Sequence, residues 1–479
     1  MDSYTFMWGQ RQSAMVAECM LRLFSDYNSE FTMTAGVDDV FREHTNGFSY
    51  IYYSKEALRN VNKNGEKYLD RTQAKKIFKR LRDTKSKAMR FYRRVARLDY
   101  GELSDKEILG IVKEYQSHLI WMNKVYRTSD PSSTGALEAV VRKTLSTRYR
   151  KGELTRNFGI LMTSTKLDRS QQELIHWCRL TSRGKRVTDR ALMKHAMRYP
   201  EKYANAWSRD EITGFLRSRM EQTSPESLSE EITAIKKFKT VVRKKQDRIY
   251  SEFKDEPTLK YYCEMLQDLG LSRFDLKEAW GGAETMMLDF LTFLAKRIGL
   301  DMASFMAAYN FTDLINFFEK GKRLTGKEIK DRTEYSILHY KGGRLRYLCG
   351  QEARDHYRQF HTSPTDVTEL RGMTANPGKV IGPVRIVRVD NLARLAQDMK
   401  AFKPGEILVT TMTSPLIIPI AVKAAAIVTN QGGICSHAAV ISREFDIPCI
   451  VGTHDATRVF KDGDLVEVDA ERGIVSKIN

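Results

Sequence analysis

Apolar residues recur at spacings of three and four along most of the first 360 residues, as they do on one face of an α-helix. The pattern is longest in Asp70–Leu98, Ser224–Gln246, Ala283–Ile298 and Glu328–Gln359. Ser224 followed by Pro225 is typical of a helix start, with a capping hydroxyl and a proline in the first turn. Phe48–Tyr53 is an exception and predicts a short hairpin arm or a buried aromatic strip. The pattern therefore predicts a large, mainly α-helical N-terminal region.

The pattern changes after about residue 372, where glycines, prolines and short β-rich runs alternate with helical segments. The predicted strands are Val380–Val389, Ile407–Thr411, Ala425–Thr429, Pro448–Val451, Leu465–Asp469 and Ile474–Ile478. The predicted helices are Leu392–Lys400, Pro415–Lys423 and Ser436–Phe445. Strands and helices in this order indicate a compact α/β domain. We expect a helical region at 1–361, a hinge rich in glycine and proline at 362–378, and the α/β domain at 379–479.

Composition adds a charge asymmetry to this picture. The 479 residues carry a net charge of +19, but residues 373–479 hold 12 Lys and Arg against 11 Asp and Glu, so the basic excess lies in the helical region. Six cysteines are scattered without close pairs, which argues against a disulfide framework or a zinc site. No apolar run is long enough to span a membrane, and the N-terminus has no basic leader. We therefore expect a cytoplasmic protein.

The chemistry most clearly encoded in the chain belongs to His437. Ala425–Thr429 is predicted to be a buried strand, Asn430–Gly433 the turn that follows it, and Ser436 the cap of the next helix. His437 then falls in the first turn of that helix, where free N–H groups and the positive end of the dipole attract phosphate. The same field disfavours the imidazolium, so a neutral and nucleophilic ring is expected near pH 7. The arrangement favours phosphohistidine chemistry, although a lone histidine at a helix start is more often a cap or a surface residue.

The whole segment resembles the swivelling phosphohistidine domain of the phosphoenolpyruvate-utilising family, which includes phosphoenolpyruvate synthase, pyruvate phosphate dikinase and the rifampicin phosphotransferases. The residues that match the family pattern are Gly432, Gly433, Ser436, His437, Ala438, Ala439, Arg443 and Glu444. Further matches are Gly378–Gly382, Ile407–Thr410, Ile447–Gly452 and Lys461–Asp469. The resemblance implies a β/β/α swivelling fold with His437 as the nucleophile. It also implies a group of phosphate-supporting residues: Thr429, Gly432, Gly433, Cys435, Ser436 and Arg443.

Two positions depart from the family pattern. Cys435 stands where Thr is common, so a hydroxyl that could touch the phosphate is missing. Leu416 stands where an acidic residue often follows a proline. Neither change removes the nucleophile, but both bear on the geometry and rate of transfer.

Members of this family usually carry an ATP-grasp nucleotide-binding domain, and we find no counterpart and no glycine-rich P-loop in this sequence. We therefore expect a separate ATP-grasp protein to bind Mg²⁺ and ATP. By the resemblance, the β-phosphoryl group of ATP would reach His437 with release of AMP and phosphate. The helical region, in Tyr4–Trp8, Lys327–Arg332 and Gly343–Arg358, resembles the acceptor-holding domain of rifampicin phosphotransferase-like proteins. We expect it to hold the small-molecule acceptor or, as the alternative, to bind a partner protein.

Other functions remain open at this level. The chain could be a non-catalytic docking or regulatory protein that retains the domain, or it could work with a barrel-type partner that uses pyruvate or phosphoenolpyruvate. Basic clusters such as Lys75–Arg97 and Lys236–Arg248 would suit nucleic acid, but interspersed acids favour solvated helix faces, so nucleic-acid binding is not expected. His176, His356 and His361 have no metal-ligand spacing and are expected to be structural, and no metal site is predicted on this chain.

Overall fold

The computed structural model falls into two compact units, which are described separately. The first comprises residues 1–133, 196–212 and 276–363, and the second comprises 134–195, 213–275 and 364–479. The residues that the structure describes are 4–22, 38–45, 48–128, 134–182, 187–204, 206–222, 224–359, 368–389, 392–413, 415–433, 436–453 and 455–478. The expected limits of 1–361, 362–378 and 379–479 differ from this division, because two helical stretches cluster with the C-terminal segment.

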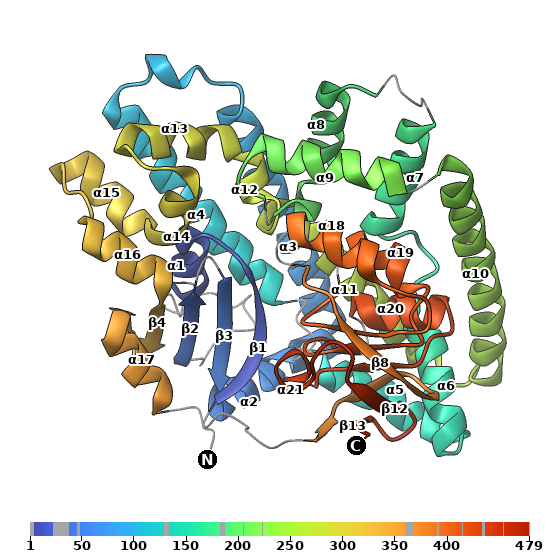
Figure 1. Ribbon diagram of the computed structural model, residues 1–479. Helices are drawn as coiled ribbons and strands as arrows, with labels where there is room; N and C mark the ends of the chain where they lie inside the picture. The colour runs from blue at the N-terminus through green and yellow to red at the C-terminus, as the bar shows by residue number, and fades with distance from the viewer. Residues whose placement is uncertain are drawn as a thin grey trace. The chain divides into compact units, whose positions relative to one another are not determined.

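The first unit contains a five-stranded antiparallel sheet in the order β1-β3-β2-β4-β5 (Figure 1). Its strands are β1 (Tyr4–Arg11), β2 (Asp39–Thr45), β3 (Phe48–Ser54), β4 (Ser336–Lys341) and β5 (Arg344–Cys349). The rings of Phe41 on β2 and Tyr52 on β3 stack on each other, with centroids 4.5 Å apart. Of these strands, the sequence pattern indicates only the aromatic run in β3.

The predicted helix Glu328–Gln359 is wrong in its centre. The structure has a helix on each side of the β4–β5 hairpin, and Gly342 and Gly343 form its tight turn with φ of 54° and 78°. Two glycines with positive φ are the signature of this kind of turn. The spacing of apolar residues alone did not distinguish the two short strands from helix.

The remaining elements of the first unit are helices. α4 begins with a capping box in which Ser104 and Glu107 exchange hydrogen bonds, and it packs on α3 where the rings of Phe91 and Tyr115 stack. The helices are α1 (Ala14–Arg22), α2 (Lys55–Asn64), α3 (Arg71–Val95), α4 (Asp105–Arg127), α12 (Ala283–Met286), α13 (Leu288–Ile298), α14 (Met302–Ala308), α15 (Phe311–Lys320), α16 (Gly326–Glu334) and α17 (Gly350–Arg358).

The helical part of the second unit is built from α5 (Gly135–Ser146), α6 (Lys151–Met162), α7 (Arg169–Thr181) and α10 (Pro225–Glu252). The limits of the two units fall inside α8 (Asp189–Arg198), α9 (Arg209–Gln222) and α11 (Pro257–Trp280). α10 confirms the predicted helix start, because the Ser224 hydroxyl accepts a hydrogen bond from the Ser227 amide at 3.1 Å and Pro225 is the first residue.

The C-terminal part of the second unit is an α/β domain with eight strands in the order β6-β13-β12-β8-β9-β10-β11-β7. β8 to β11 are parallel neighbours, and antiparallel strands flank them. The strands are β6 (Glu369–Arg371), β7 (Met373–Asn376), β8 (Lys379–Ile386), β9 (Ile407–Thr410), β10 (Ala426–Thr429), β11 (Cys449–Val451), β12 (Leu465–Asp469) and β13 (Ile474–Lys477). The helices are α18 (Leu392–Ala401), α19 (Ile418–Ala421), α20 (His437–Glu444) and α21 (Ala456–Val459).

The expected mainly helical region followed by a C-terminal α/β domain is confirmed, but part of the expected hinge is not a linker. β6 and β7 lie within 362–378 and pair with β13 and β11 at the two edges of the sheet. Their backbone hydrogen bonds make them part of the domain, while residues 362–367 lie outside the described residues. No helix in the described part of the chain has the length and apolar character that a membrane span requires.

Candidate functional site

The candidate site is the connection from β10 to α20. The turn after β10 is held by backbone bonds from Asn430 to Thr410 and from Gln431 to Thr411. Gly432 has φ of +117°, and a Cβ there would lie 2.9 Å from the Cβ and Oγ of Ser436, so the turn has room only for glycine. Ser436 caps α20, and its hydroxyl accepts a hydrogen bond from the Ala439 amide at 3.3 Å. This strand, turn and capped helix agree with the sequence prediction.

His437 is the first residue of α20 and is only 8% exposed. Its Nδ1 lies 3.0 Å from the hydroxyl of Thr413, which is itself buried in the loop after β9. Phe274 of α11, in the helical part of the second unit, lies against the imidazole edge to face, with its ring centroid 5.9 Å from that of His437. The imidazole is thus oriented by a hydroxyl and held against an aromatic ring in a largely water-excluded position.

The other residues predicted to support the phosphate lie in different places. Thr429 is fully buried and its hydroxyl donates to the carbonyl of Gln431, so it shapes the turn. Gly433 accepts a backbone bond from Ser436 at 2.9 Å. Arg443 lies near the opposite end of α20, where its guanidinium donates to the carbonyl of Ala375 at 3.4 Å. Cys435 lies outside the described residues. His437, Gly432, Gly433 and Ser436 are therefore brought together, whereas Arg443 is not.

Thr413 is a neighbour of His437 that the sequence analysis does not predict, although the expected order of the strands could have indicated it. β9 and β10 are adjacent parallel strands, with Thr410 in register with Thr429. The loops that follow adjacent parallel strands meet at the same edge of a sheet. A polar residue just after β9 was therefore a candidate neighbour of His437.

α20 is also anchored at its C-terminal end. Lys239 of α10 lies 3.0 Å from Glu444, and Gln171 of α7 donates to the same carboxylate oxygen at 2.8 Å. Burial raises the pKa of the Glu444 carboxyl, and the positive charge of Lys239 offsets part of that rise. These contacts could not be predicted from local sequence patterns, because the partners lie more than 200 residues away along the chain.

A second buried polar network lies among the helices of this unit. Glu173 accepts from Arg219 at 2.6 Å and lies 2.7 Å from Nε2 of His195, whose Nδ1 lies 2.8 Å from Nδ1 of His176. Burial raises the pKa of the nearby Glu231 carboxyl to about 7. No cluster of three or more metal-ligating side chains occurs within the described ranges of the chain.

The C-terminal segment is similar in sequence to a domain of known proteins. Residues 402–473 match the family model described as the mobile domain of PEP-utilising enzymes. The segment is 49% identical over 108 residues to phosphoenolpyruvate synthase of Pyrococcus furiosus and 45% identical over 106 residues to a probable phosphoenolpyruvate synthase of Archaeoglobus fulgidus. It is 46% identical over 111 residues to chondramide synthase of Chondromyces crocatus.

These alignments cover 22%, 22% and 23% of this chain. They span only 12%, 13% and 3% of the three relatives, so the likeness concerns one domain and not the rest of those proteins. The matched residues contain β9 to β12, α20 and His437. Residues 402–473 therefore form a mobile domain of the kind found in phosphoenolpyruvate-utilising enzymes.

Proposed function

We propose that the chain is a phosphotransferase subunit in which His437 carries the phosphoryl group. The observation that carries the proposal is the position of His437 at the first residue of a capped helix, after a glycine turn, with Nδ1 on the Thr413 hydroxyl. The likeness to the mobile domain of phosphoenolpyruvate synthases supports a phosphotransferase-type role.

The hydrogen bond to Thr413 favours one nitrogen as the nucleophile. When Nδ1–H donates to the Thr413 hydroxyl, the neutral imidazole keeps its lone pair on Nε2. That lone pair attacks phosphorus, an N–P bond forms, and the bond to the departing oxygen of the donor breaks. The amide groups at the start of α20 favour the charge of the phosphoryl group.

The donor and the acceptor belong to the proposal as well. A separate ATP-grasp protein would bind Mg²⁺ and ATP, and Mg²⁺ would offset the charge of the phosphates. The β-phosphoryl group would go to His437, the γ-phosphate would leave as inorganic phosphate after hydrolysis, and AMP would be released. The helical region would hold a small-molecule acceptor, with pyruvate as the alternative if the partner is of the barrel type.

The burial of His437 supports a moving carrier. His437 is 8% exposed and its ring lies against Phe274, so this arrangement leaves no room for a bulky donor such as ATP beside the ring. Excluding water around the phosphohistidine would also protect the labile N–P bond from hydrolysis. We infer that this arrangement is the shielded one, and that the domain accepts its phosphoryl group after leaving it.

The nucleophile can be tested without the partner by using phosphoramidate, a chemical donor that phosphorylates histidine. We expect the full chain to gain one acid-labile, base-stable phosphoryl group at His437 in preference to its eight other histidines. His437→Ala should abolish that labelling, and Thr413→Val should slow it about tenfold, because the orienting bond is lost. Thr411→Val, in the same loop, is the matched control and should behave like the wild type. Labelling spread over other histidines, with His437 unmodified, would refute the carrier role.

The donor is tested separately with ATP labelled in the β-phosphoryl group and a candidate ATP-grasp protein. Transfer of label to His437, with release of AMP, is the expected result. If phosphoramidate modifies His437 but ATP with the ATP-grasp protein does not, the nucleophile stands and the proposed donor is wrong.

A further inference from the structure

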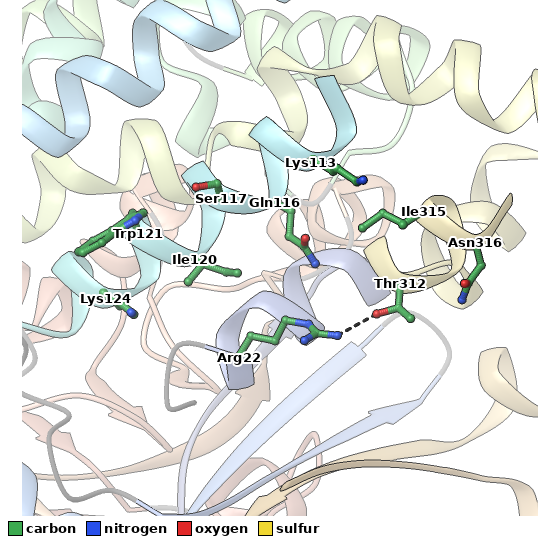
Figure 2. Close-up of a pocket in the computed structure, with 10 residues that line it drawn as sticks. All are labelled: Arg22, Lys113, Gln116, Ser117, Ile120, Trp121, Lys124, Thr312, Ile315 and Asn316. Carbon is green, nitrogen blue, oxygen red and sulfur yellow. Dashed lines mark hydrogen bonds between the residues drawn. The ribbon is translucent and has the colours of Figure 1, made fainter. Parts of the chain in front are cut away.

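The first unit contains a cavity of about 490 Å³ that plays no part in the proposed carrier role of His437. Figure 2 shows it between α4, the end of α1 and α15. Its volume is in the range of pockets that hold small molecules. The residues that line it are Arg22, Lys113, Gln116, Ser117, Ile120, Trp121, Lys124, Thr312, Ile315 and Asn316.

The lining of the cavity has one sign of charge. Arg22, Lys113 and Lys124 are cationic, and none of the ten lining residues is acidic. Lys124 is only 1% exposed, and its Nζ lies 4.8 Å from the centre of the Trp121 ring. Arg80 adds a further cation 5.0 Å from the same ring. The positive charges of Arg22, Lys113 and Lys124 on a wall without acidic side chains favour an entering anion.

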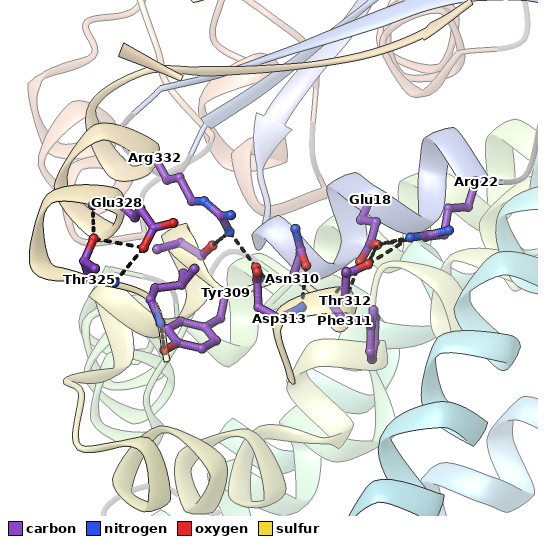
Figure 3. Close-up of polar contacts among 12 residues, drawn as sticks. Glu18, Arg22, Tyr309, Asn310, Phe311, Thr312, Asp313, Thr325, Glu328 and Arg332 are labelled. Atoms are coloured by element: carbon purple, nitrogen blue, oxygen red, sulfur yellow. Dashed lines mark hydrogen bonds and ion pairs between the residues drawn. The ribbon is translucent and has the colours of Figure 1, made fainter. Parts of the chain in front are cut away.

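Hydrogen bonds and ion pairs orient two of the cationic side chains, Arg22 and Lys113. Glu18 accepts from the amide of Phe311 at 2.8 Å, caps the start of α15 in this way, and pairs with Arg22 at 2.7 Å. Arg22 in turn donates to the Thr312 hydroxyl at 2.8 Å, as Figures 2 and 3 show. Lys113 pairs with Glu319 at 2.7 Å. Neither acid lines the cavity, so both orient cations without filling the space between them.

α15, which contributes to the lining of the cavity, is held by its own N-terminal cap and by a contact with α16. Asn310 and Asp313 form a capping box at the start of the helix, and the Asp313 carboxylate also accepts a hydrogen bond from the guanidinium of Arg332 on α16 at 2.5 Å (Figure 3). A site whose walls are fixed before binding loses less entropy when a ligand enters. Ile120, Ile315 and Trp121 offer apolar surface beside the cations, whereas Gln116, Ser117 and Asn316 offer neutral hydrogen-bonding groups.

We propose that this cavity is a binding site for a small organic anion, with a phosphate or carboxylate group near Arg22, Lys113 and Lys124 and an apolar body against Ile120, Trp121 and Ile315. The cations select the charged group, and the apolar side chains favour an organic anion over inorganic phosphate. The inference does not rest on the proposed role of His437, because no residue of the mobile domain takes part.

The test is a calorimetric titration of the full chain with phenyl phosphate, and with phenol and inorganic phosphate as matched probes. We expect phenyl phosphate to bind at least about tenfold more tightly than either, because only it satisfies both halves of the site. Ser117→Glu, which places a carboxylate in the lining, should weaken binding about tenfold. Lys106→Gln, on an exposed face of the same helix, makes the same change in net charge and should leave binding unchanged.

Two further variants test the role of Lys124 and the independence of this cavity from His437. Lys124→Met should weaken the binding of phenyl phosphate, and Ser117→Glu decides the matter if Lys124→Met does not fold by circular dichroism. His437→Ala should bind phenyl phosphate as the wild type does, which separates this site from the carrier role. Equal affinity for phenyl phosphate and phenol would overturn the proposal, and so would equal effects of Ser117→Glu and Lys106→Gln.

Discussion

Replacement of Lys239 by methionine should loosen α20 from the helices of the second unit. Lys239 and Glu444 form an ion pair at 3.0 Å, with side chains 9% and 5% exposed. Methionine keeps most of the apolar stem of lysine but removes the ammonium group, which also donates to the carbonyl of Ser164 at 2.8 Å. The variant therefore leaves the Glu444 carboxylate buried without its cation.

The magnitude follows from what remains around Glu444. Leaving one charge of a buried pair uncompensated costs about 3–5 kcal/mol. Gln171 still donates to the carboxylate, which reduces the loss. Protonation of Glu444 sets an upper limit to the loss of stability. Protonating a carboxyl of ordinary pKa at pH 7 costs about 3.7 kcal/mol, and a buried carboxylate that would cost more than this becomes neutral instead. We expect the free energy of opening of α20 to fall by about 3 kcal/mol.

The assay is native-state hydrogen exchange of the α20 amides, which reports opening of this helix rather than unfolding of the whole chain. Lys236→Met, on the exposed face of α10, is the matched control and should have little effect. Adding Glu444→Gln to Lys239→Met should restore part of the loss, because the unpaired charge is gone.

The loss should also depend on pH. The folded-state pKa of Glu444 is already raised by burial, and without Lys239 it rises further. A carboxyl with a raised folded-state pKa takes up its proton more readily when folded, so stability falls as pH rises from the unfolded pKa through the folded pKa. The variant should thus be closest to the wild type at acidic pH. A loss below about 0.5 kcal/mol at pH 7.5, or a double variant no better than Lys239→Met, would refute the reasoning.

Two further substitutions test the turn and the buried network. Gly432→Ala should destabilise the mobile domain by about 1–3 kcal/mol and reduce phosphoramidate labelling of His437. Gly110→Ala is the control and should do neither, because a Cβ at Gly110 has no other atom within 4 Å. Thermal unfolding measures the stability, and mass spectrometry measures the labelling. Glu231→Gln should remove about 3 kcal/mol of destabilisation at pH 8 but less than about 1 kcal/mol at pH 5, because burial raises the pKa of Glu231 to about 7 and the ionised form is the disfavoured one. The change in melting temperature with pH reports this, and an unchanged pH profile in Glu231→Gln would contradict it.

The turn at His437 could be predicted because its signals are local in sequence. A buried strand, two glycines and a capping serine occur within about ten residues and agree with one another. Thr413 and Phe274 could not be found in that way, since they reach His437 through sheet register and through helix packing. The sequence thus predicts the candidate nucleophile, whereas tertiary contacts supply the hydroxyl and the aromatic ring that lie against it.

The sheet of the first unit escaped prediction for a different reason. β2 contains the consecutive charged or polar residues Arg42, Glu43 and His44, all of them buried, which hides the alternation expected of a half-buried strand. Arg42 donates to Gln12, and His44 lies 2.7 Å from the Ser49 hydroxyl. Buried charges are tolerated only where such partners exist, and the pattern of a single strand does not reveal them.

The contacts of α20 are compatible with the movement that the proposed carrier role requires. One end of the helix lies against Phe274 and the other against Lys239, so in the proposed mechanism both ends would separate before His437 meets a donor. A buried ion pair contributes little net stability, because the desolvation of both charges offsets most of their attraction. When the two charges separate into water, each regains its hydration, and the cost of release is small. Lys239→Met is costly for the opposite reason, since the Glu444 charge stays buried. The same pair can therefore fix where the domain docks without locking it there.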